Sequence, residues 1–287
     1  MTVATLREVV EPAFAARYGV PAINIFNDLT LEAVLAGAEK AQSPVIVQTS
    51  VKTVKSIGAD VLAAMWRAMV ARVSVPAVLH LDHCPEVEVV KTCLENGWNS
   101  VLFDGSSLPA EQNLALTTQV VEMAKAYGAQ VEGELEAITG VEDDHGSDDE
   151  AERHSLQASL DFIDATGIDV FAPSIGNAHG AYKSAPVLDF DRVSDLVRER
   201  SIPIALHGGS GMSNEQFAEL IARGCAKVNI STSLKETYMK STLAFLKGAE
   251  ANDKWDPPSQ FAAVRSDIID LVVDLAEQFG STGKAGA

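Results

Sequence analysis

The sequence predicts a single-domain (β/α)8 TIM barrel followed by an extra C-terminal helix. Eight short apolar runs rich in β-branched residues alternate with amphipathic helical segments along most of the 287-residue chain. A strand followed by a helix, eight times over, is the pattern of such a barrel. Glycines end several helical segments, as a left-handed cap prefers. We therefore assign residues 1–280 to the barrel and 281–287 to a short flexible tail.

Each predicted element is short enough for one barrel unit. The strands are expected over 22–26, 45–49, 77–81, 100–103, 130–134, 170–173, 204–206 and 227–230. The helices between them are expected over 31–41, 61–72, 86–96, 110–127, 160–165, 190–198 and 214–223, with Asp60 as the N-cap of the second. The alternative, an open doubly wound sheet, would normally carry a glycine-rich phosphate loop after its first strand. The residues there, Asn24-Ile25-Phe26-Asn27, include no glycine.

Three further segments complete the chain. Residues 233–245 should form the eighth helix, and residues 259–279 should form another after the turn Asp256-Pro257-Pro258. The stretch 141–154 is acidic, poor in apolar residues and long for a connection between a strand and a helix. It is either a solvated surface loop or a lid over the site, and the sequence leaves both open.

Composition limits the partners and the location. The 22 basic and 40 acidic side chains give a net charge of −18, which argues against nucleic acid and anionic membranes as partners. No apolar run approaches the roughly 20 residues that a membrane span needs, and the N-terminus has no signal-sequence pattern. The three cysteines form neither a disulfide framework nor a CxxC site. We therefore expect a cytoplasmic protein.

Polar residues cluster where the predicted strands end, which is where barrel enzymes carry their chemistry. These strand ends carry Asp82-His83, Asp104-Gly105, Glu132-Gly133-Glu134, the stretch from Ile175 to Gly180, His207 with its glycines, and Asn229 with Thr232. Only six histidines occur in the chain, yet His83, His179 and His207 all fall at this end. Three imidazoles at one mouth form the ligand set of a catalytic Zn²⁺ with an open position.

The other histidines are interpreted differently. In a strand, residues 80 and 82 share one face and 83 lies on the other, so His80 should be a supporting residue beneath Asp82. His145 and His154 lie in the acidic stretch and are expected to be solvated.

The segments after strands six to eight also resemble an anion site. Gly180, Gly208, Gly209 and Gly211 let backbone N–H groups approach an anion, and Ser210 and Thr232 add hydroxyl donors. The loops after strands seven and eight are the usual phosphate cradle of this fold. Lys183 and Lys235 supply nearby cations.

With these residues in place, the sequence resembles the class II, metal-dependent fructose/tagatose-bisphosphate aldolase family. The motifs HLDH, FDGSS, EGELE…GVEDD, IGNAHGAYK, HGGSG and KVNISTSLK occur in the order and spacing of that family over roughly residues 5 to 250. The resemblance implies that His83, His179 and His207 bind Zn²⁺ and that Asp82 is the acid/base at the C4 hydroxyl of the substrate. It also implies a second or alternative metal site at Asp104 and Glu134, and proton exchange at C3 by Glu142, which would make the acidic stretch a lid.

The substrate-binding residues are assigned from the resemblance and from their positions at the mouth of the predicted barrel. The dihydroxyacetone-phosphate half would be bound by Gly180, Lys183, Gly208, Gly209, Ser210, Asn229, Ser231, Thr232 and Lys235. Asn24, Ser50 and Lys52, at the ends of the first two strands, are assigned to substrate binding as well. The implied reaction is reversible cleavage of a ketose 1-phosphate or bisphosphate to dihydroxyacetone phosphate and an aldehyde, through an enediolate stabilised by Zn²⁺ as Lewis acid. No lysine Schiff base is then needed. By analogy with the family, the protein should be a homodimer or homotetramer.

The sequence departs from the family pattern at three places. Glu136 and Thr139 replace glycines near the acidic stretch, so the lid could move differently. Where bisphosphate aldolases carry DPRK, whose arginine binds the far phosphate, this chain has Asp256-Pro257-Pro258-Ser259. We therefore expect weak or altered use of fructose 1,6-bisphosphate. The far end of the substrate would be uncharged, or a phosphate or sulfonate held by a substitute cation such as Lys52, Lys55 or Arg265.

Two other functions compete with this interpretation. A metal-dependent hydrolase on the same barrel would usually begin with an HxH pair on its first strand, where this chain has Asn24-Ile25-Phe26. A non-catalytic aldolase-like subunit would be expected to lack ligands, and none is missing from the sequence.

Overall fold

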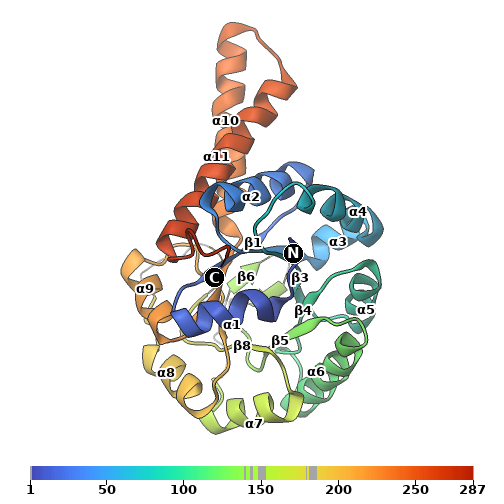
Figure 1. Ribbon diagram of the computed structural model, residues 1–287, viewed down its shortest axis with the longest axis vertical. Helices are drawn as coiled ribbons and strands as arrows, with labels where there is room; N and C mark the ends of the chain where they lie inside the picture. The colour runs from blue at the N-terminus through green and yellow to red at the C-terminus, as the bar shows by residue number, and fades with distance from the viewer. Residues whose placement is uncertain are drawn as a thin grey trace.

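Eight parallel strands close into a barrel in the computed structural model of the chain (Figure 1). The structure describes residues 2–138, 140–142, 145–147, 153–178, 180 and 186–286. The barrel strands are β1 (Val20–Asn24), β2 (Val45–Ser50), β3 (Ala77–Cys84), β4 (Ser100–Phe103), β5 (Gln130–Glu134), β8 (Val170–Ala172), β9 (Ile204–Leu206) and β10 (Cys225–Ile230). Each strand pairs with the next one along the chain, and β1 pairs with β10. The predicted (β/α)8 barrel is confirmed.

Helices surround the barrel in chain order. They are α2 (Asp28–Ala41), α3 (Val51–Ile57), α4 (Ala59–Val70), α5 (Val87–Asn96), α6 (Ala110–Lys125), α7 (Leu156–Thr166), α8 (Phe190–Glu199) and α9 (Asn214–Arg223). The short helix α3 was not predicted. The predicted cap at Asp60 was wrong, because Gly58 is the N-cap of α4 and Asp60 lies in its first turn. Ser155 caps α7, which therefore starts before the predicted residue 160.

The interior of the barrel is divided into an apolar floor and a polar mouth. Helix α1 (Leu6–Ala16) lies across the N-terminal end of the barrel, and its buried side chains form one cluster with small or apolar strand residues such as Ala22, Ile46 and Val78 (Figure 1). Side chains two positions further along the strands are Asn24, Gln48 and His80, which are also buried. Because strand side chains alternate, these polar residues lie directly above the floor.

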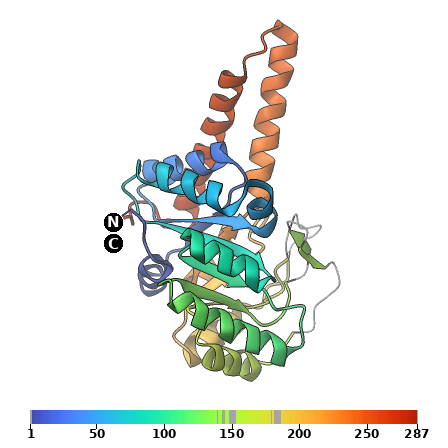
Figure 2. The same cartoon turned by 90° about the vertical axis from the view of Figure 1, so that its right-hand side faces the viewer.

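A hairpin stands at the mouth after β5. Strands β6 (Gly140–Glu142) and β7 (His145–Ser147) pair in antiparallel fashion, with Glu142 opposite His145. Figure 2 shows the hairpin on the side of the barrel away from the two chain termini. The described part of the acidic stretch therefore includes a β-hairpin. Thr139 lies outside the described residues.

The last two helices form an arm. Helices α10 (Thr232–Asn252) and α11 (Pro257–Gln278) are longer than predicted, and they project together from the barrel (Figures 1 and 2). The inner part of α11 buries Val264, Ile268 and Val272. The turn that carries Asp256 lies at the outer end of the arm, away from the mouth of its own barrel.

The end of the chain, expected as a flexible tail, is packed against the barrel. Ser281 is fully buried, and its hydroxyl is 2.8 Å from that of Ser43. The backbone N–H groups of Gly283 and Ala285 donate to carbonyls at the end of α2. Nowhere in the described chain does a helix combine the length and apolarity needed to cross a bilayer.

The contact between α2 and α11 yields a stability prediction. A Cβ on Gly37 would lie 2.6 Å from Cβ of Val272. Gly37→Ala should therefore destabilise the protein by about 1–3 kcal/mol from overpacking, although alanine normally stabilises a helix interior by roughly 0.5–1 kcal/mol relative to glycine. Chemical denaturation would measure the change.

Gly248→Ala in α10 is the matched control, because a Cβ there meets nothing within 4 Å. It should be neutral or stabilising. Equal effects of the two substitutions would contradict the proposed clash at Gly37.

Candidate active site

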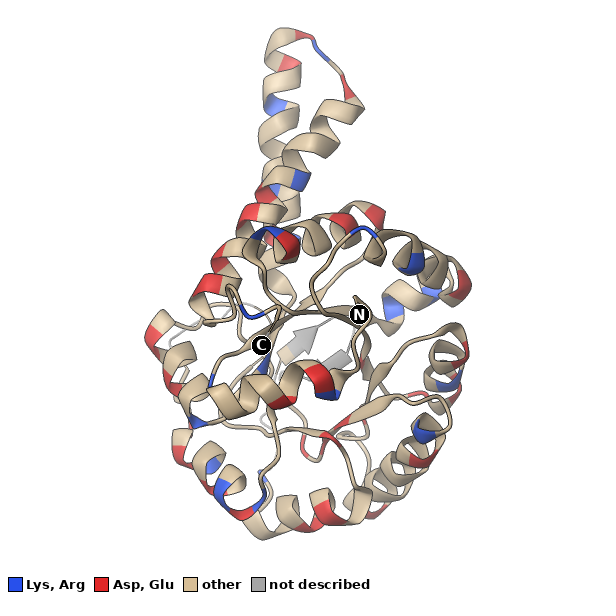
Figure 3. Ribbon diagram, in the orientation of Figure 1, with Lys and Arg blue, Asp and Glu red and all other residues tan. Residues whose placement is uncertain are grey.

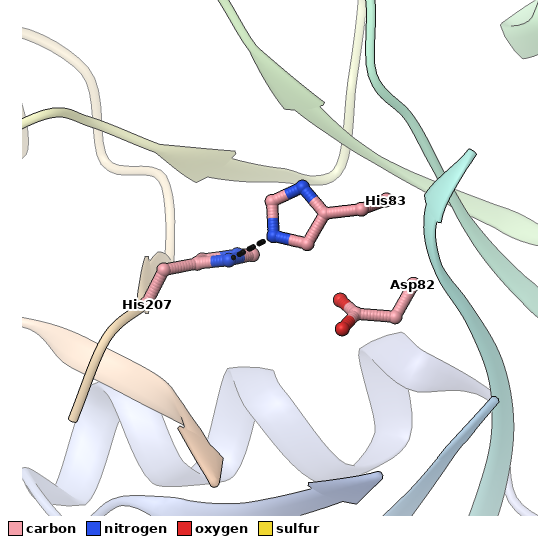
Figure 4. A group of neighbouring side chains, drawn as sticks. All are labelled: Asp82, His83 and His207. Carbon is pink, nitrogen blue, oxygen red and sulfur yellow. Dashed lines mark hydrogen bonds between the residues drawn. The ribbon is translucent and has the colours of Figure 1, made fainter. Parts of the chain in front are cut away.

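Strand β3 brings both Asp82 and His83 to the mouth of the barrel. Regular alternation would send them to opposite faces, as we expected from the sequence. Instead His83 has a left-handed backbone (φ 42°), and the pairing register of β3 with β4 shifts between Leu81 and Cys84. Ligand atoms of Asp82, His83 and His207 consequently lie within 4.8 Å of one another (Figure 4). The expected separation of residues 82 and 83 was wrong because this irregularity redirects the His83 side chain.

The rings of His83 and His207 are nearly perpendicular, at 78°, and one nitrogen of each ring points at the other. Nε2 of His83 is 2.8 Å from Nδ1 of His207 (Figure 4). The outer nitrogens contact carboxylates: Nδ1 of His83 is 2.8 Å from Oδ2 of Asp104, and Nε2 of His207 is 2.6 Å from Oε1 of Glu132. An ionised carboxylate can only accept, so each outer nitrogen carries the N–H and each inner nitrogen presents a lone pair.

Two lone pairs at this separation require a cation between them, either a proton or a metal ion. Burial lowers the pKa of His83, but Asp82 and Asp104 outweigh burial and hold it well above its usual value. Burial lowers the pKa of His207 to about 4, despite its contact with Glu132. One proton can lie between the two nitrogens, and a divalent metal bound there would displace it. The donor set, two imidazoles each oriented by a carboxylate, fits Zn²⁺.

The third predicted ligand, His179, lies outside the described residues, and so does Lys183. The residues before His179 are in contact with the His207 segment. Nδ2 of Asn177 donates to the His207 carbonyl at 2.9 Å. A Cβ on Gly208 would lie only 2.2 Å from the carbonyl oxygen of Ala178, so the φ of 63° and the close approach both require glycine there.

A second acidic cluster adjoins His83. Ligand atoms of His83, Asp104 and Glu134 lie within 4.8 Å of one another, as the prediction of an additional metal site requires. Asp104 also accepts from the backbone and hydroxyl of Ser106, at 3.1 and 2.5 Å. Glu134 is buried, and burial and the charge of Asp104 raise its pKa well above the usual value. A cation bound there would stabilise the ionised form of Glu134.

Asp82 is held by amides. Nδ2 of Asn24 donates to Oδ2 of Asp82 at 2.8 Å, and Gln48 in turn donates to Asn24 at 2.7 Å. Nδ2 of Asn229 lies 3.4 Å from Oδ1. Burial would raise the pKa of Asp82, but His83 and Lys227 outweigh it and hold the pKa below its usual range. The carboxylate is therefore ionised and held in a fixed position.

His80 lies beneath this group without a direct hydrogen bond to Asp82. Its Nδ1 is 2.7 Å from the hydroxyl of Ser100, and its Nε2 is 4.0 Å from Oδ1 of Asp82 and 3.8 Å from Oε2 of Glu132. Burial lowers the pKa of His80 to about 3, so the ring is neutral. The sequence placed His80 below Asp82 correctly but did not show its bond to Ser100.

Sequence reasoning assigned no role to Lys227 or Glu132. Lys227 is fully buried, with Nζ 2.8 Å from Oε2 of Glu132 and 2.7 Å from Oδ1 of Asn229. The alternation of side chains in a strand could have placed both residues inside the barrel. Residue 227 shares a strand face with Asn229, and residue 132 shares one with Glu134. The signal in the sequence was Lys227 itself, a lysine within a mostly apolar strand.

The opposite side of the mouth presents groups suited to an anion. Helix α10 begins there, and Ser231 is its N-cap. The Ser231 hydroxyl oxygen is buried and has no hydrogen-bond partner among the described residues. The hydroxyls of Ser210 and Ser233 are 3.3 Å apart, and Thr232 and Lys235 lie in the first turn of α10.

Gly209 packs against the Asn229 carbonyl, where a Cβ would be 3.1 Å away. Gly180 also has a left-handed backbone (φ 81°).

The three cations predicted to replace the arginine of the DPRK motif lie in different surroundings. Lys52 is exposed in α3, next to Ser50, whose side chain is the N-cap of that helix. Lys55 pairs with Glu86 at 2.5 Å. Arg265 binds Glu32 of α2 through two nitrogens, at 2.5 and 2.7 Å. Arg265 is therefore already paired at the base of the arm.

Glu136, which replaces a glycine of the family pattern, forms a buried ion pair. Its buried carboxylate accepts from Nη2 of Arg192 at 2.6 Å, and Arg192 also donates to the His154 carbonyl at 2.9 Å. The segment after β5 is thereby joined to α8 and to the residue before Ser155. Of the expected solvated histidines, His154 has an intermediate exposure, and the side chain of His145 is not described.

Comparisons with known proteins agree with this geometry. Residues 4–284 match the family described as fructose-bisphosphate aldolase class-II. The chain is 32% identical to a sulfofructosephosphate aldolase of Alkalicoccus urumqiensis, covering 97% of both sequences. It is 33% identical to a fructose-bisphosphate aldolase of Geobacillus stearothermophilus, covering 99% of both.

Solved structures give the same result. The YdjI aldolase from Escherichia coli K12 superposes with a TM-score of 0.86 and 28% identity over 99% of both chains. A putative fructose-1,6-bisphosphate aldolase from Coccidioides immitis gives a TM-score of 0.87 and 29% identity, again over 99% of both. The chain therefore belongs to the class II fructose-bisphosphate aldolase family and is an aldolase, a lyase of carbon–carbon bonds.

Proposed function

We propose that this protein is a Zn²⁺-dependent aldolase that reversibly cleaves a ketose 1-phosphate or ketose bisphosphate to dihydroxyacetone phosphate and an aldehyde. The observation that carries the proposal is the pair of facing imidazole nitrogens, 2.8 Å apart, beside the ionised Asp82. A cation site next to a positioned base is what cleavage beside a ketone requires.

The metal would be held by His83 and His207, with His179 as the third ligand. The contacts of Asn177 and Ala178 with the His207–Gly208 segment support the assignment of His179. Asp104 and Glu134 would form a second or alternative site. When bound, Zn²⁺ supplies Lewis-acid stabilisation of the negative charge that develops at the ketone oxygen.

Asp82 and Glu142 would move the protons. Asp82 takes the proton of the C4 hydroxyl as the C3–C4 bond breaks, which leaves the electron pair on the dihydroxyacetone-phosphate half and releases the aldehyde. Glu142, in the hairpin after β5, then returns a proton to C3. The position of β6 at the mouth supports this role.

The phosphate of the dihydroxyacetone-phosphate half would lie at the start of α10. A 21-residue helix begins there, and its N-terminal N–H groups and dipole favour an anion. The buried hydroxyl of Ser231 supplies a further donor. Gly180, Lys183, Gly208, Gly209, Ser210, Asn229, Thr232 and Lys235 would complete this side, while Asn24 and Ser50 border the reacting carbons.

The metal and base assignments predict contrasting variants. His83→Ala or His207→Ala should abolish stoichiometric Zn²⁺ binding and cleavage, because each removes a ligand. Asp82→Ala should keep the metal and lose cleavage by about 10²- to 10⁴-fold, the usual contribution of an acid/base group. Metal analysis of purified protein and a coupled assay for dihydroxyacetone phosphate would measure both.

Glu142→Ala serves as a control in these assays, because it should retain Zn²⁺ while slowing proton exchange on dihydroxyacetone phosphate. EDTA should abolish the activity and added Zn²⁺ should restore it. Full metal content and turnover in His207→Ala protein would refute the ligand assignment. A wild-type protein without any lyase activity would instead favour the non-catalytic subunit.

The far end of the substrate concerns a separate part of the proposed pocket. The two similar aldolases named above act on sugars that end in a sulfonate or a phosphate, according to their names. We propose Lys52 as the cation for a charged far group, because it lies in the first turn of the helix that begins at Ser50, where β2 ends at the mouth of the barrel. Lys55 and Arg265 contact the carboxylates of Glu86 and Glu32, at 2.5 Å in each case.

This proposal predicts altered substrate preference. Fructose 1,6-bisphosphate should be a weak substrate compared with another ketose phosphate or a 6-sulfonate analogue, because the arginine of the DPRK motif is absent. Values of kcat/KM over a panel of ketose 1-phosphates, 1,6-bisphosphates and the sulfonate would measure it. Lys52→Ala should selectively weaken the substrates with a charged far end, with Lys55→Ala as the matched control. A best rate on fructose 1,6-bisphosphate with no effect of Lys52→Ala would refute the argument.

We also propose that the arm joins two copies of the chain. Met239, Leu243 and Leu246 are 65%, 53% and 43% exposed, and their spacing places them on one face of α10. Trp255 and Phe261, at the outer end of the arm, are 63% and 49% exposed. Figure 3 shows that the arm is mostly uncharged while the helices around the barrel carry many charges. Such an apolar surface typically marks a protein interface.

An arm-mediated oligomer predicts that Leu243→Glu lowers the molar mass in solution, measured by sedimentation or light scattering. Val187→Glu is the control, because Val187 is 90% exposed but lies outside the arm. An unchanged mass for both variants would exclude the arm as the interface.

A further inference from the structure

The only lysine that is fully buried in the described part of the chain lies in the barrel interior, below the site. Both of its contacts are to oxygen atoms: Nζ of Lys227 is 2.8 Å from Oε2 of Glu132 and 2.7 Å from Oδ1 of Asn229. Lysine is almost never fully buried unless it is paired, because removing an ammonium from water is costly. The position therefore requires a compensating role.

The two partners of Lys227 lead to different parts of the site. Through Oε1, Glu132 contacts Nε2 of His207 at 2.6 Å. Through its amide nitrogen, Asn229 contacts Oδ1 of Asp82 at 3.4 Å and Nδ1 of His207 at 3.3 Å. One ammonium is thus two contacts away from both a proposed metal ligand and the proposed base.

The ammonium of Lys227 can only donate hydrogen bonds, and this fixes the donors and acceptors around it. Asn229 must use its oxygen for Lys227, so its NH₂ group faces Asp82 and the His207 ring. Glu132 is balanced by the ammonium at Oε2, which leaves Oε1 as a fixed acceptor for His207. His207 must then carry its proton on Nε2 and present the lone pair of Nδ1 to His83.

We propose that Lys227 is a positioning residue that couples the metal-holding and proton-moving halves of the site. This inference rests on the proposed function, since it concerns a Zn²⁺ ligand and the base Asp82. Lys227 contacts neither the metal nor the substrate in this proposal. It acts by fixing the tautomer of His207 and the orientation of the Asn229 amide.

The chain contains a matched control for a merely structural ion pair. Glu136 and Arg192 also form a buried pair, at 2.6 Å, and Glu136 lies four residues after Glu132. No hydrogen bond of the described structure joins Glu136 to His83 or His207. Glu132→Gln and Glu136→Gln therefore both break a buried pair, but only the first should alter the metal site.

The first measurement is the Zn²⁺ dissociation constant of the full-length protein, by competition with a chromogenic chelator. Glu132→Gln and Lys227→Met should each weaken Zn²⁺ binding about 10- to 100-fold, as loss of an outer partner of a histidine ligand typically does. Glu136→Gln should stay within about twofold of the wild type. If Lys227→Met does not fold, the double variant Lys227→Met/Glu132→Gln removes both charges, and it should fold with the same weakened affinity.

The second measurement separates the two halves at saturating Zn²⁺, using the ketose phosphate that is cleaved best in the panel above. Glu132→Gln should regain most of its kcat, because Lys227 still orients Asn229. Lys227→Met should remain at least about tenfold lower in kcat, because Asp82 has lost its oriented amide. Recovery of Lys227→Met to the wild-type kcat, or wild-type Zn²⁺ affinity in the variants, would overturn the coupling. Absence of Zn²⁺ binding by the wild type would instead refute the proposed function.

Discussion

The carboxylate of Glu132 is the constraint on which the geometry of the site depends. It lies between a buried ammonium at 2.8 Å and an imidazole N–H at 2.6 Å, so both of its oxygens are occupied. Burial would raise the pKa of Glu132, but Lys227 and His207 outweigh burial and hold it below its usual range. An ionised acceptor at Nε2 favours the His207 tautomer whose Nδ1 lone pair points toward His83. The barrel can enclose these charges because they balance one another within hydrogen-bond distance.

The backbone of His83 is the second constraint. A non-glycine residue in the left-handed region costs about 1–3 kcal/mol and persists only where its surroundings determine it. Here the contacts with Asp104 and His207, at 2.8 Å each, hold the ring in place. This backbone conformation allows the proposed base and a proposed metal ligand, which are adjacent in sequence, to reach the same site. A regular strand could provide only one of them.

The barrel supports this site by separating apolar from polar layers. Helix α1 closes one end over small side chains such as Ala22 and Val78, which excludes water from the floor. Two residues further along the strands, buried polar groups form a connected network beneath Asp82, from Gln48 through Asn24. The arm leaves the barrel beside the mouth, since α10 begins at the proposed phosphate site and continues outward. The same helix therefore serves the pocket at one end and carries an exposed apolar face along its length.

The sequence by itself determined the barrel, because each strand and helix has its own hydrophobic period and its own end signals, which are local properties. It also determined that His83 and His207 lie at the carboxyl ends of strands, because every parallel strand of a closed barrel ends at the same rim. Only the tertiary structure showed that the side chains of Asp82 and His83 point to the same site. The left-handed backbone of His83 cannot be predicted from the alternation of apolar and polar residues in a strand. It also decided that Lys227 meets Glu132, residues 95 positions apart on strands that are not neighbours. Such a pairing depends on which side chains face each other across the closed barrel. No local sequence pattern predicts a contact between residues that are so far apart in the chain.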